Sequence, residues 1–267
     1  MKTISSYKSL LYSLVLFALF GAIIWTINVL GQSIFPGYKL FPLFMRSIIL
    51  APLLMLCYYV NYRFIEKNAL NNEILKFKAK SFKLYLGGIA LACLLLATIW
   101  VVIYLIYPFE IIRNSGTKVN FATDLISYSM GNTLEELLFR GFLLVAAIRL
   151  FGKIGAIFFV SLLFGLFHLQ GLGMTRGGLT MVITTFTMAL LFTAVIYYTK
   201  SIWTAVTLHI AGNLILHTFG FDGTNNGLFE IRFCTSNING NLTLLIYEFV
   251  IIAFALFLFL RSRINAS

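Results

Sequence analysis

Residues 124–151 read DLISYSMGNTLEELLFRGFLLVAAIRLF, an apolar stretch long enough to cross a membrane that nevertheless contains Glu135, Glu136 and Arg140. A helix needs about 20 apolar residues to span the hydrocarbon core of a bilayer. A charge at the centre of the bilayer costs at least about 2.5–3.5 kcal/mol, so charged residues in such a stretch are candidates for function. This stretch therefore predicts a helical membrane protein with a polar site inside it.

The composition of the whole chain agrees with this prediction. Of its 267 residues 60% are hydrophobic and 11% are charged, and the mean hydropathy is +0.93. Soluble domains contain about 45–50% apolar and about 25% charged residues, and a domain of this size cannot hide so much apolar surface from water. The composition therefore excludes a disordered chain, a fibrous repeat and a coiled coil, and it favours an integral membrane protein with several spans.

Apolar runs cover most of the chain and are separated by short polar segments. The sequence predicts an all-α polytopic membrane protein, a bundle of about eight transmembrane helices. The expected spans are approximately 10–30, 43–62, 84–107, 122–149, 154–170, 179–199, 202–219 and 242–260.

The basic residues indicate how the helices are oriented. The net charge is +11, which in a soluble protein would suggest a nucleic-acid partner. In a membrane protein Lys and Arg collect in cytoplasmic loops; here thirteen fall on one predicted side, six on the other, and Arg140 lies within a span. We therefore expect a multi-pass protein of the cell membrane with both termini cytoplasmic, the lipid bilayer as its surroundings and no nucleic-acid partner. The segment 77–83, FKAKSFK, is expected along the inner membrane surface, and a plain solvated loop is the alternative.

The remaining unusual residues are imidazoles and an amide in the later spans. His168 lies in the fifth run, and His209, Asn213 and His217 lie in the seventh. The spacing of the last three, i, i+4 and i+8, places them on one face of a helix. His217 is nearest the end of its run and is expected to be an interfacial histidine.

Helix geometry separates the three charged residues of the fourth run. Glu136 and Arg140 are four residues apart, so they share a face and can form an ion pair, and a paired charge is much less costly to bury than a lone one. Glu135 points about 100° away and faces other groups. The alternative is that all three only hold helices together, which accounts well for Glu136 and Arg140 and poorly for Glu135.

The chemistry of these residues is typical of hydrolysis. A carboxylate beside a histidine, here Glu135 with His168, can take a proton from water. A second histidine with an amide, here His209 with Asn213, can stabilise a tetrahedral oxyanion. Two histidines and one carboxylate are also a set of zinc ligands, which leaves a metal site open. The chain contains neither HExxH nor GxSxG, so neither of those hydrolase motifs is indicated.

At these positions the sequence resembles the CAAX protease and bacteriocin-processing (CPBP or Abi) family, the type II CAAX prenyl endopeptidases. EELLFR fits the family's EExxxR motif, FGLFH fits FxxxH, and HIAGN fits a histidine followed four residues later by asparagine. Three motifs in the family's order, each in a separate apolar run, are much more specific than any one alone. The motif residues are Glu135, Glu136, Arg140, Phe164, His168, His209 and Asn213.

The resemblance implies an intramembrane endopeptidase whose catalytic core is 121–219. It further implies that Glu135 and His168 activate water, that His209 and Asn213 hold the oxyanion, and that Glu136, Arg140 and Phe164 support the site. The flanking segments are then 1–120, with three spans and a basic linker, and 220–267, with a polar loop and the last span.

No cofactor is favoured, because a metal-free glutamate mechanism gives every motif residue a task. If zinc is bound, its ligands are Glu135, His168 and His209. The expected substrate is a peptide or a membrane protein, and a chain this compact is typical of bacterial members.

Two functions of other classes compete with the protease. A non-enzymatic bacteriocin-immunity or scaffold protein can share the fold, but it has no need of the complete Glu and His set. A proton-coupled transporter also buries such residues, but it predicts paired polar groups in repeated halves, whereas here they cluster in one half of the chain.

Overall fold

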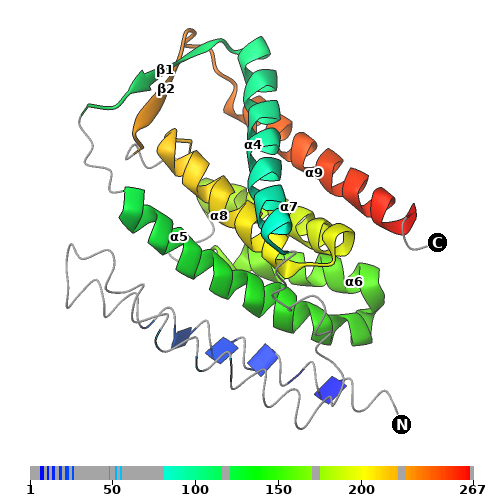
Figure 1. Ribbon diagram of the computed structural model, residues 1–267. Helices are drawn as coiled ribbons and strands as arrows, with labels where there is room; N and C mark the ends of the chain where they lie inside the picture. The colour runs from blue at the N-terminus through cyan, green and yellow to red at the C-terminus, as the bar shows by residue number, and fades with distance from the viewer. Residues whose placement is uncertain are drawn as a thin grey trace. The chain divides into compact units, whose positions relative to one another are not determined.

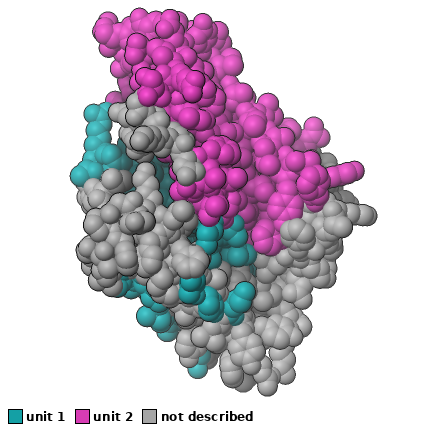
Figure 2. All heavy atoms as spheres, turned by 60° about the vertical axis from the view of Figure 1, so that its left-hand side comes forward, with its two compact units in different colours: residues 1–76, 130–193 teal, residues 77–129, 194–267 magenta. Residues whose placement is uncertain are grey.

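The computed structural model describes residues 81–115, 121–169, 175–221 and 227–264, together with isolated helical positions at 7–8, 11, 14–15, 18–19, 22–23, 26, 48, 52 and 55. The chain divides into two compact units, coloured separately in Figure 2. One comprises Met1–Lys76 and Met130–Thr193, and the other Phe77–Ser129 and Ala194–Ser267.

Helices form nearly all of the described chain, which confirms the all-α class (Figure 1). The predicted spans from 84–107 onward coincide with helices to within a few residues. The helices are α4 (Ser81–Ile106), α5 (Phe121–Glu136), the π-helix η2 (Leu137–Leu143), α6 (Leu144–Phe167), α7 (Arg176–Thr199), α8 (Ile202–Thr218) and α9 (Gly240–Ile264).

Four of the described helices are long and apolar enough to cross a membrane: 82–106, 150–167, 176–199 and 240–262. Their exposed faces are apolar, as with Leu105 of α4 and Phe249 of α9, which are 75% and 72% exposed. Exposed apolar surface on this scale is typical of contact with lipid. The described residues thus supply four of the roughly eight predicted spans. Most of the runs 10–30 and 43–62 and most of the basic segment 77–83 lie outside the described residues.

A glycine separates the fourth predicted span from the fifth. Gly152 has φ 67° and ψ 177°, so the helical path is interrupted there within α6. A residue with a Cβ is strained at this positive φ, whereas glycine adopts it readily. The continuous helical segment that begins with α5 therefore ends at Gly152, after η2 and the first part of α6. This agrees with the predicted break between 149 and 154.

A two-stranded antiparallel ribbon was not predicted from the sequence. Strand β1 (Phe109–Arg113) pairs with β2 (Phe229–Phe233), with Ile111 opposite Ile231 and Glu110 opposite Arg232. The segments FEIIR and FEIRF begin with the same alternation of apolar and charged residues, which is typical of short strands. Both segments lie outside the apolar runs from which the spans are predicted.

In the second unit α4 packs closely against α8, the helix that carries His209 (Figure 1). A Cβ added at Gly88 would lie 2.9 Å from the backbone N of Leu208 and still closer to Thr204 O and Thr207 Oγ1. Small residues allow helix backbones to approach in this way within membranes. Gly88 therefore fixes α4 against the turn of α8 that precedes His209.

Candidate active site

The charged pair of the fourth span is closed to solvent. Arg140 Nη1 donates a hydrogen bond to Glu136 Oε1 at 3.0 Å, and both side chains are 0% exposed. The pairing predicted from the i, i+4 spacing is therefore present. Arg140 lies in the π-helix η2, a departure from regular helix that is frequent at functional sites and that the sequence analysis did not anticipate.

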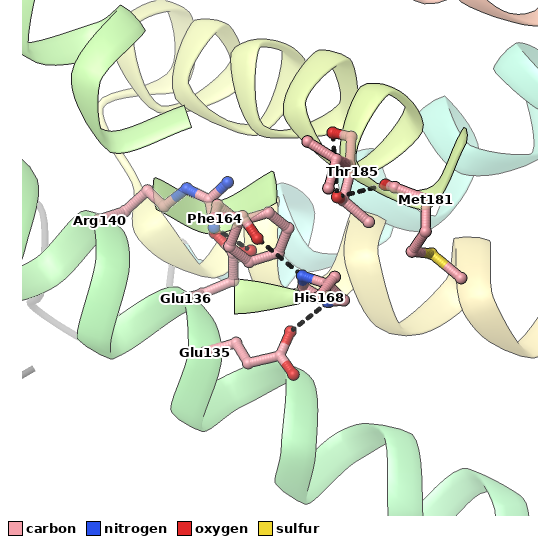
Figure 3. Close-up of polar contacts among 8 residues, drawn as sticks. Glu135, Glu136, Arg140, Phe164, His168, Met181 and Thr185 are labelled. Atoms are coloured by element: carbon pink, nitrogen blue, oxygen red, sulfur yellow. Dashed lines mark hydrogen bonds and ion pairs between the residues drawn. The ribbon is translucent and has the colours of Figure 1, made fainter. Parts of the chain in front are cut away.

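Three aromatic rings lie around the guanidinium of Arg140 in the first unit, and Figure 3 shows that of Phe164. Its Cζ lies 4.2 Å from the ring centroid of Phe164, 5.2 Å from that of Phe192 and 5.8 Å from that of Phe139. Among the described residues no acceptor reaches Nε or Nη2 of Arg140. Attraction to the ring faces therefore helps to stabilise the buried charge. This arrangement gives Phe164 a physical reason to accompany the charged pair.

Glu135 has surroundings different from those of its neighbour Glu136. Its Oε2 faces His168 Nε2 at 4.0 Å, and the side chains of Glu135 and His168 are 26% and 24% exposed (Figure 3). The separation is longer than a direct hydrogen bond. Adjacent carboxylates thus have separate environments, one sealed against Arg140 and one accessible beside an imidazole. The predicted separation of the two glutamates is present.

The tautomer of His168 follows from its second nitrogen. His168 Nδ1 lies 2.8 Å from the carbonyl oxygen of Phe164, and because a carbonyl only accepts, Nδ1 must carry the hydrogen. In the neutral ring Nε2 is then an acceptor directed toward Glu135. His168, expected within the span 154–170, is the C-cap of α6.

A second close helix contact holds His168 in place. A Cβ added at Gly165 would lie 2.7 Å from the carbonyl oxygen of Val182 on α7. Gly165 precedes His168 by three residues. The backbone N–H of His168 donates a hydrogen bond to the carbonyl oxygen of Gly165 at 3.0 Å, in the last turn of α6. The glycine of FGLFH, Gly165, therefore lets the end of α6 pack closely against α7.

The predicted oxyanion residues lie on α8, in the second unit. His209 is buried and Asn213, one turn later, is half-buried. Their placement on one helix face agrees with the prediction. Their roles, like those of the other motif residues, remain predictions.

His217, expected to be an interfacial histidine, lies one residue before the end of α8 at Thr218. It is buried, and its Nε2 lies 3.5 Å from Oδ2 of Asp124 in the first turn of α5. The ring of Tyr128 meets its edge, with centroids 6.0 Å apart. The carboxylate of Asp124 and the ring of Tyr128 thus cover the imidazole of His217, although this histidine lies close to a helix end.

Asp124 and Glu248 were missed as polar residues of interest. Glu248 is buried within α9, in the apolar window 240–262. The rule that singled out Glu135 also applies to it, because any ionisable residue within a span is a functional candidate. Asp124 was missed because it lies at the polar beginning of its run.

The fold and these contacts define a helical membrane protein with a buried ion pair and an accessible Glu–His pair. Residues 117–215 match the family model described as type II CAAX prenyl endopeptidase Rce1-like. The match contains all three motifs and confirms the resemblance to the CAAX protease family. No curated protein matches the chain.

Proposed function

We propose that this protein is an intramembrane endopeptidase of the CAAX type that hydrolyses a peptide bond with water activated by Glu135 and His168. One observation carries the proposal: of two adjacent glutamates, Glu136 is sealed in an ion pair, while Glu135 is accessible and faces an imidazole at 4.0 Å. Neighbouring carboxylates in contrasting environments are the usual sign of divided roles. The family match over 117–215 supports the same reaction class.

In the first step a water molecule lies between the Glu135 carboxylate and Nε2 of His168. Both groups are acceptors, so the water can donate one hydrogen bond to each. Glu135 takes a proton as the water oxygen attacks the carbonyl carbon of the substrate. The Nδ1–H of His168 stays on Phe164 O and keeps the ring in this orientation.

In the second step the tetrahedral intermediate collapses. His209 and Asn213 donate hydrogen bonds to its oxyanion, since imidazole and amide N–H groups are suitable donors. The protonated Glu135 then gives its proton to the leaving amine nitrogen as the C–N bond breaks. Water is consumed, and a carboxylic acid and an amine are produced.

Glu136, Arg140 and Phe164 support this site without entering the reaction. The 3.0 Å ion pair and the aromatic rings hold η2 in place, and η2 begins at Leu137, two residues after Glu135. Arg140 rests on the ring of Phe164, whose carbonyl oxygen accepts the bond from His168. The supporting residues thus connect to both proposed catalytic groups.

Two imidazoles and a carboxylate are donor types that zinc takes, although no three His, Cys, Asp or Glu side chains are grouped as a metal site among the residues that the structure describes. If zinc is bound, Glu135, His168 and His209 would hold it, and the Nδ1 bond of His168 is the support that metal-binding histidines usually have. Zinc, when bound, lowers the pKa of a coordinated water. Glu136 is committed to Arg140 and cannot act as a separate base, so the proposal assigns every proton transfer to Glu135 and favours no metal.

We propose a peptide or membrane protein as substrate, in a bacterial cell membrane with both termini of the enzyme cytoplasmic. The name of the matched family points to prenylated CAAX proteins. Prenylated and unmodified substrates would be cleaved by the same hydrolysis of a peptide bond. Assays with and without the prenyl group distinguish them.

The test uses the purified full chain in liposomes with a quenched fluorescent peptide, supplied with and without a C-terminal farnesyl cysteine motif. We expect cleavage of at least one form, with one 18O atom from labelled water in the new carboxylate by mass spectrometry. A folded protein that cleaves neither these peptides nor a reconstituted single-span membrane peptide would contradict the proposal and favour the scaffold alternative.

A further inference from the structure

A polar contact outside the three motifs joins α5 to α8 within the second unit. The carboxylate of Asp124 and the imidazole of His217 approach to 3.5 Å, and their side chains are 21% and 11% exposed. Each residue occupies a favourable end of its helix, because an acidic group is stabilised in a first turn and a basic one in a last turn. The contact therefore pairs opposite helix ends as well as two side chains.

The His217 end of α8 is firmly held. Phe219, the C-cap of α8, stacks on Phe229 of β2 with centroids 5.2 Å apart, and Trp100 of α4 packs against Phe219 at 4.9 Å. A Cβ added at Gly227 would lie 2.5 Å from the carbonyl oxygen of His217. Strand β2, Gly227 and helix α4 thus pack against the end of α8 that carries His217.

Helix periodicity relates this contact to the proposed catalytic groups. Asp124 and Glu135 are eleven residues apart on α5, which is about 1100° of rotation, so they lie within about 20° of each other on one face. On α8 His217 lies one turn beyond Asn213 on the face that also carries His209. On each helix the contact uses the face that bears the proposed catalytic residues.

We propose that Asp124 and His217 form a positioning contact that sets the rotation and axial register of the first turns of α5 against the end of α8, within the second unit. The inference rests on the proposed function, because α8 carries the proposed oxyanion pair His209–Asn213 and α5 carries Glu135 eleven residues after Asp124. Neither residue touches the reacting atoms. Loss of the contact lets α5 turn or slide, and misplacement of a catalytic group by about 1 Å can reduce a rate on the order of 100-fold.

The experiment compares Asp124→Asn, His217→Gln, the combined variant and the exchanged pair Asp124→His with His217→Asp. Glu230→Gln is the control, because Glu230 forms an exposed ion pair with Arg232 at 2.7 Å in the same unit. The full chain is assayed in liposomes with the cleavable peptide, and thermal unfolding is followed separately. All rates are taken well below the unfolding midpoint of the least stable variant.

We expect each single variant to lower kcat on the order of 10-fold or more with KM within about twofold, and the combined variant to be no worse than either. The exchanged pair should recover a substantial part of kcat, and Glu230→Gln should match the unchanged protein. Unfolding midpoints should show the same non-additivity.

Additive losses in both kcat and midpoint, or single variants with unchanged kcat, would overturn the positioning role. Unfolding is measured without substrate, so the two proposals can fail separately. An unchanged protein that cleaves no peptide overturns the proposed function and the catalytic part of this inference. Coupled midpoints in that same protein would show the contact itself to be real.

Discussion

Glu136 and Arg140 are one helical turn apart, and their 3.0 Å ion pair is closed to solvent on both sides. Removing one member strands the other charge in an apolar interior, which costs about 3–5 kcal/mol. We therefore expect Arg140→Ala to lower expression and the unfolding midpoint strongly. The double variant Glu136→Gln with Arg140→Met should be milder, because no charge is stranded. Equal midpoints for the single and double variants in a thermal unfolding assay would refute this account of the pair.

The approach of α4 to α8 at Gly88 predicts a sharp difference between adjacent glycines. Gly88→Ala places a methyl group against the α8 backbone just before His209, whereas a Cβ at Gly87 meets nothing within 4 Å. We expect Gly88→Ala to reduce both stability and peptide cleavage, and Gly87→Ala to leave cleavage unchanged. Comparable behaviour of the two variants would mean that the close approach is not needed.

Gly165 provides the corresponding test in the first unit. Gly165 lies three residues before His168, and a methyl group on it collides with the carbonyl oxygen of Val182 on α7. Gly131 on α5, in contrast, has open space around its Cβ position. We expect Gly165→Ala to impair cleavage, and Gly131→Ala to be neutral or to stabilise by about 0.5–1 kcal/mol through helix propensity. The two variants are compared by unfolding midpoint and cleavage rate, and normal cleavage by folded Gly165→Ala is the contrary outcome.

Metal content separates the two versions of the mechanism. The metal-free version predicts less than one zinc per chain by elemental analysis and cleavage that survives a chelator. One tightly held zinc per chain, with cleavage lost on stripping and restored on adding zinc back, would reverse this choice. Glu135, His168 and His209 would then be its ligands.

The sequence predicted the long helices well because each is a long apolar run between polar segments. The expected runs 179–199 and 202–219 match α7, Arg176–Thr199, and α8, Ile202–Thr218. The i, i+4 pairing of Glu136 with Arg140 was also correct, because residues four apart share a helix face and the π-helix at Arg140 leaves the two side chains within 3.0 Å.

Features that depend on tertiary packing were not predicted. The π-helix around Arg140 departs from the 3.6-residue period that the sequence analysis assumed. The partner of His217 is Asp124, 93 residues earlier, and no local pattern relates the two. The ribbon β1–β2 likewise joins segments 120 residues apart. Such contacts depend on how the helices and strands pack in three dimensions, so they cannot be predicted from the hydropathy of the sequence.

The most direct test of the central claim is the cleavage rate of Glu135→Gln beside that of the unchanged protein and Glu230→Gln. The substitution keeps the size of the side chain that faces His168 at 4.0 Å and removes its ability to take a proton. General-base catalysis contributes about 10²–10⁴-fold. The account predicts a folded Glu135→Gln protein with a cleavage rate reduced at least on this scale, while Glu230→Gln cleaves normally. Full cleavage by a folded Glu135→Gln protein would contradict it.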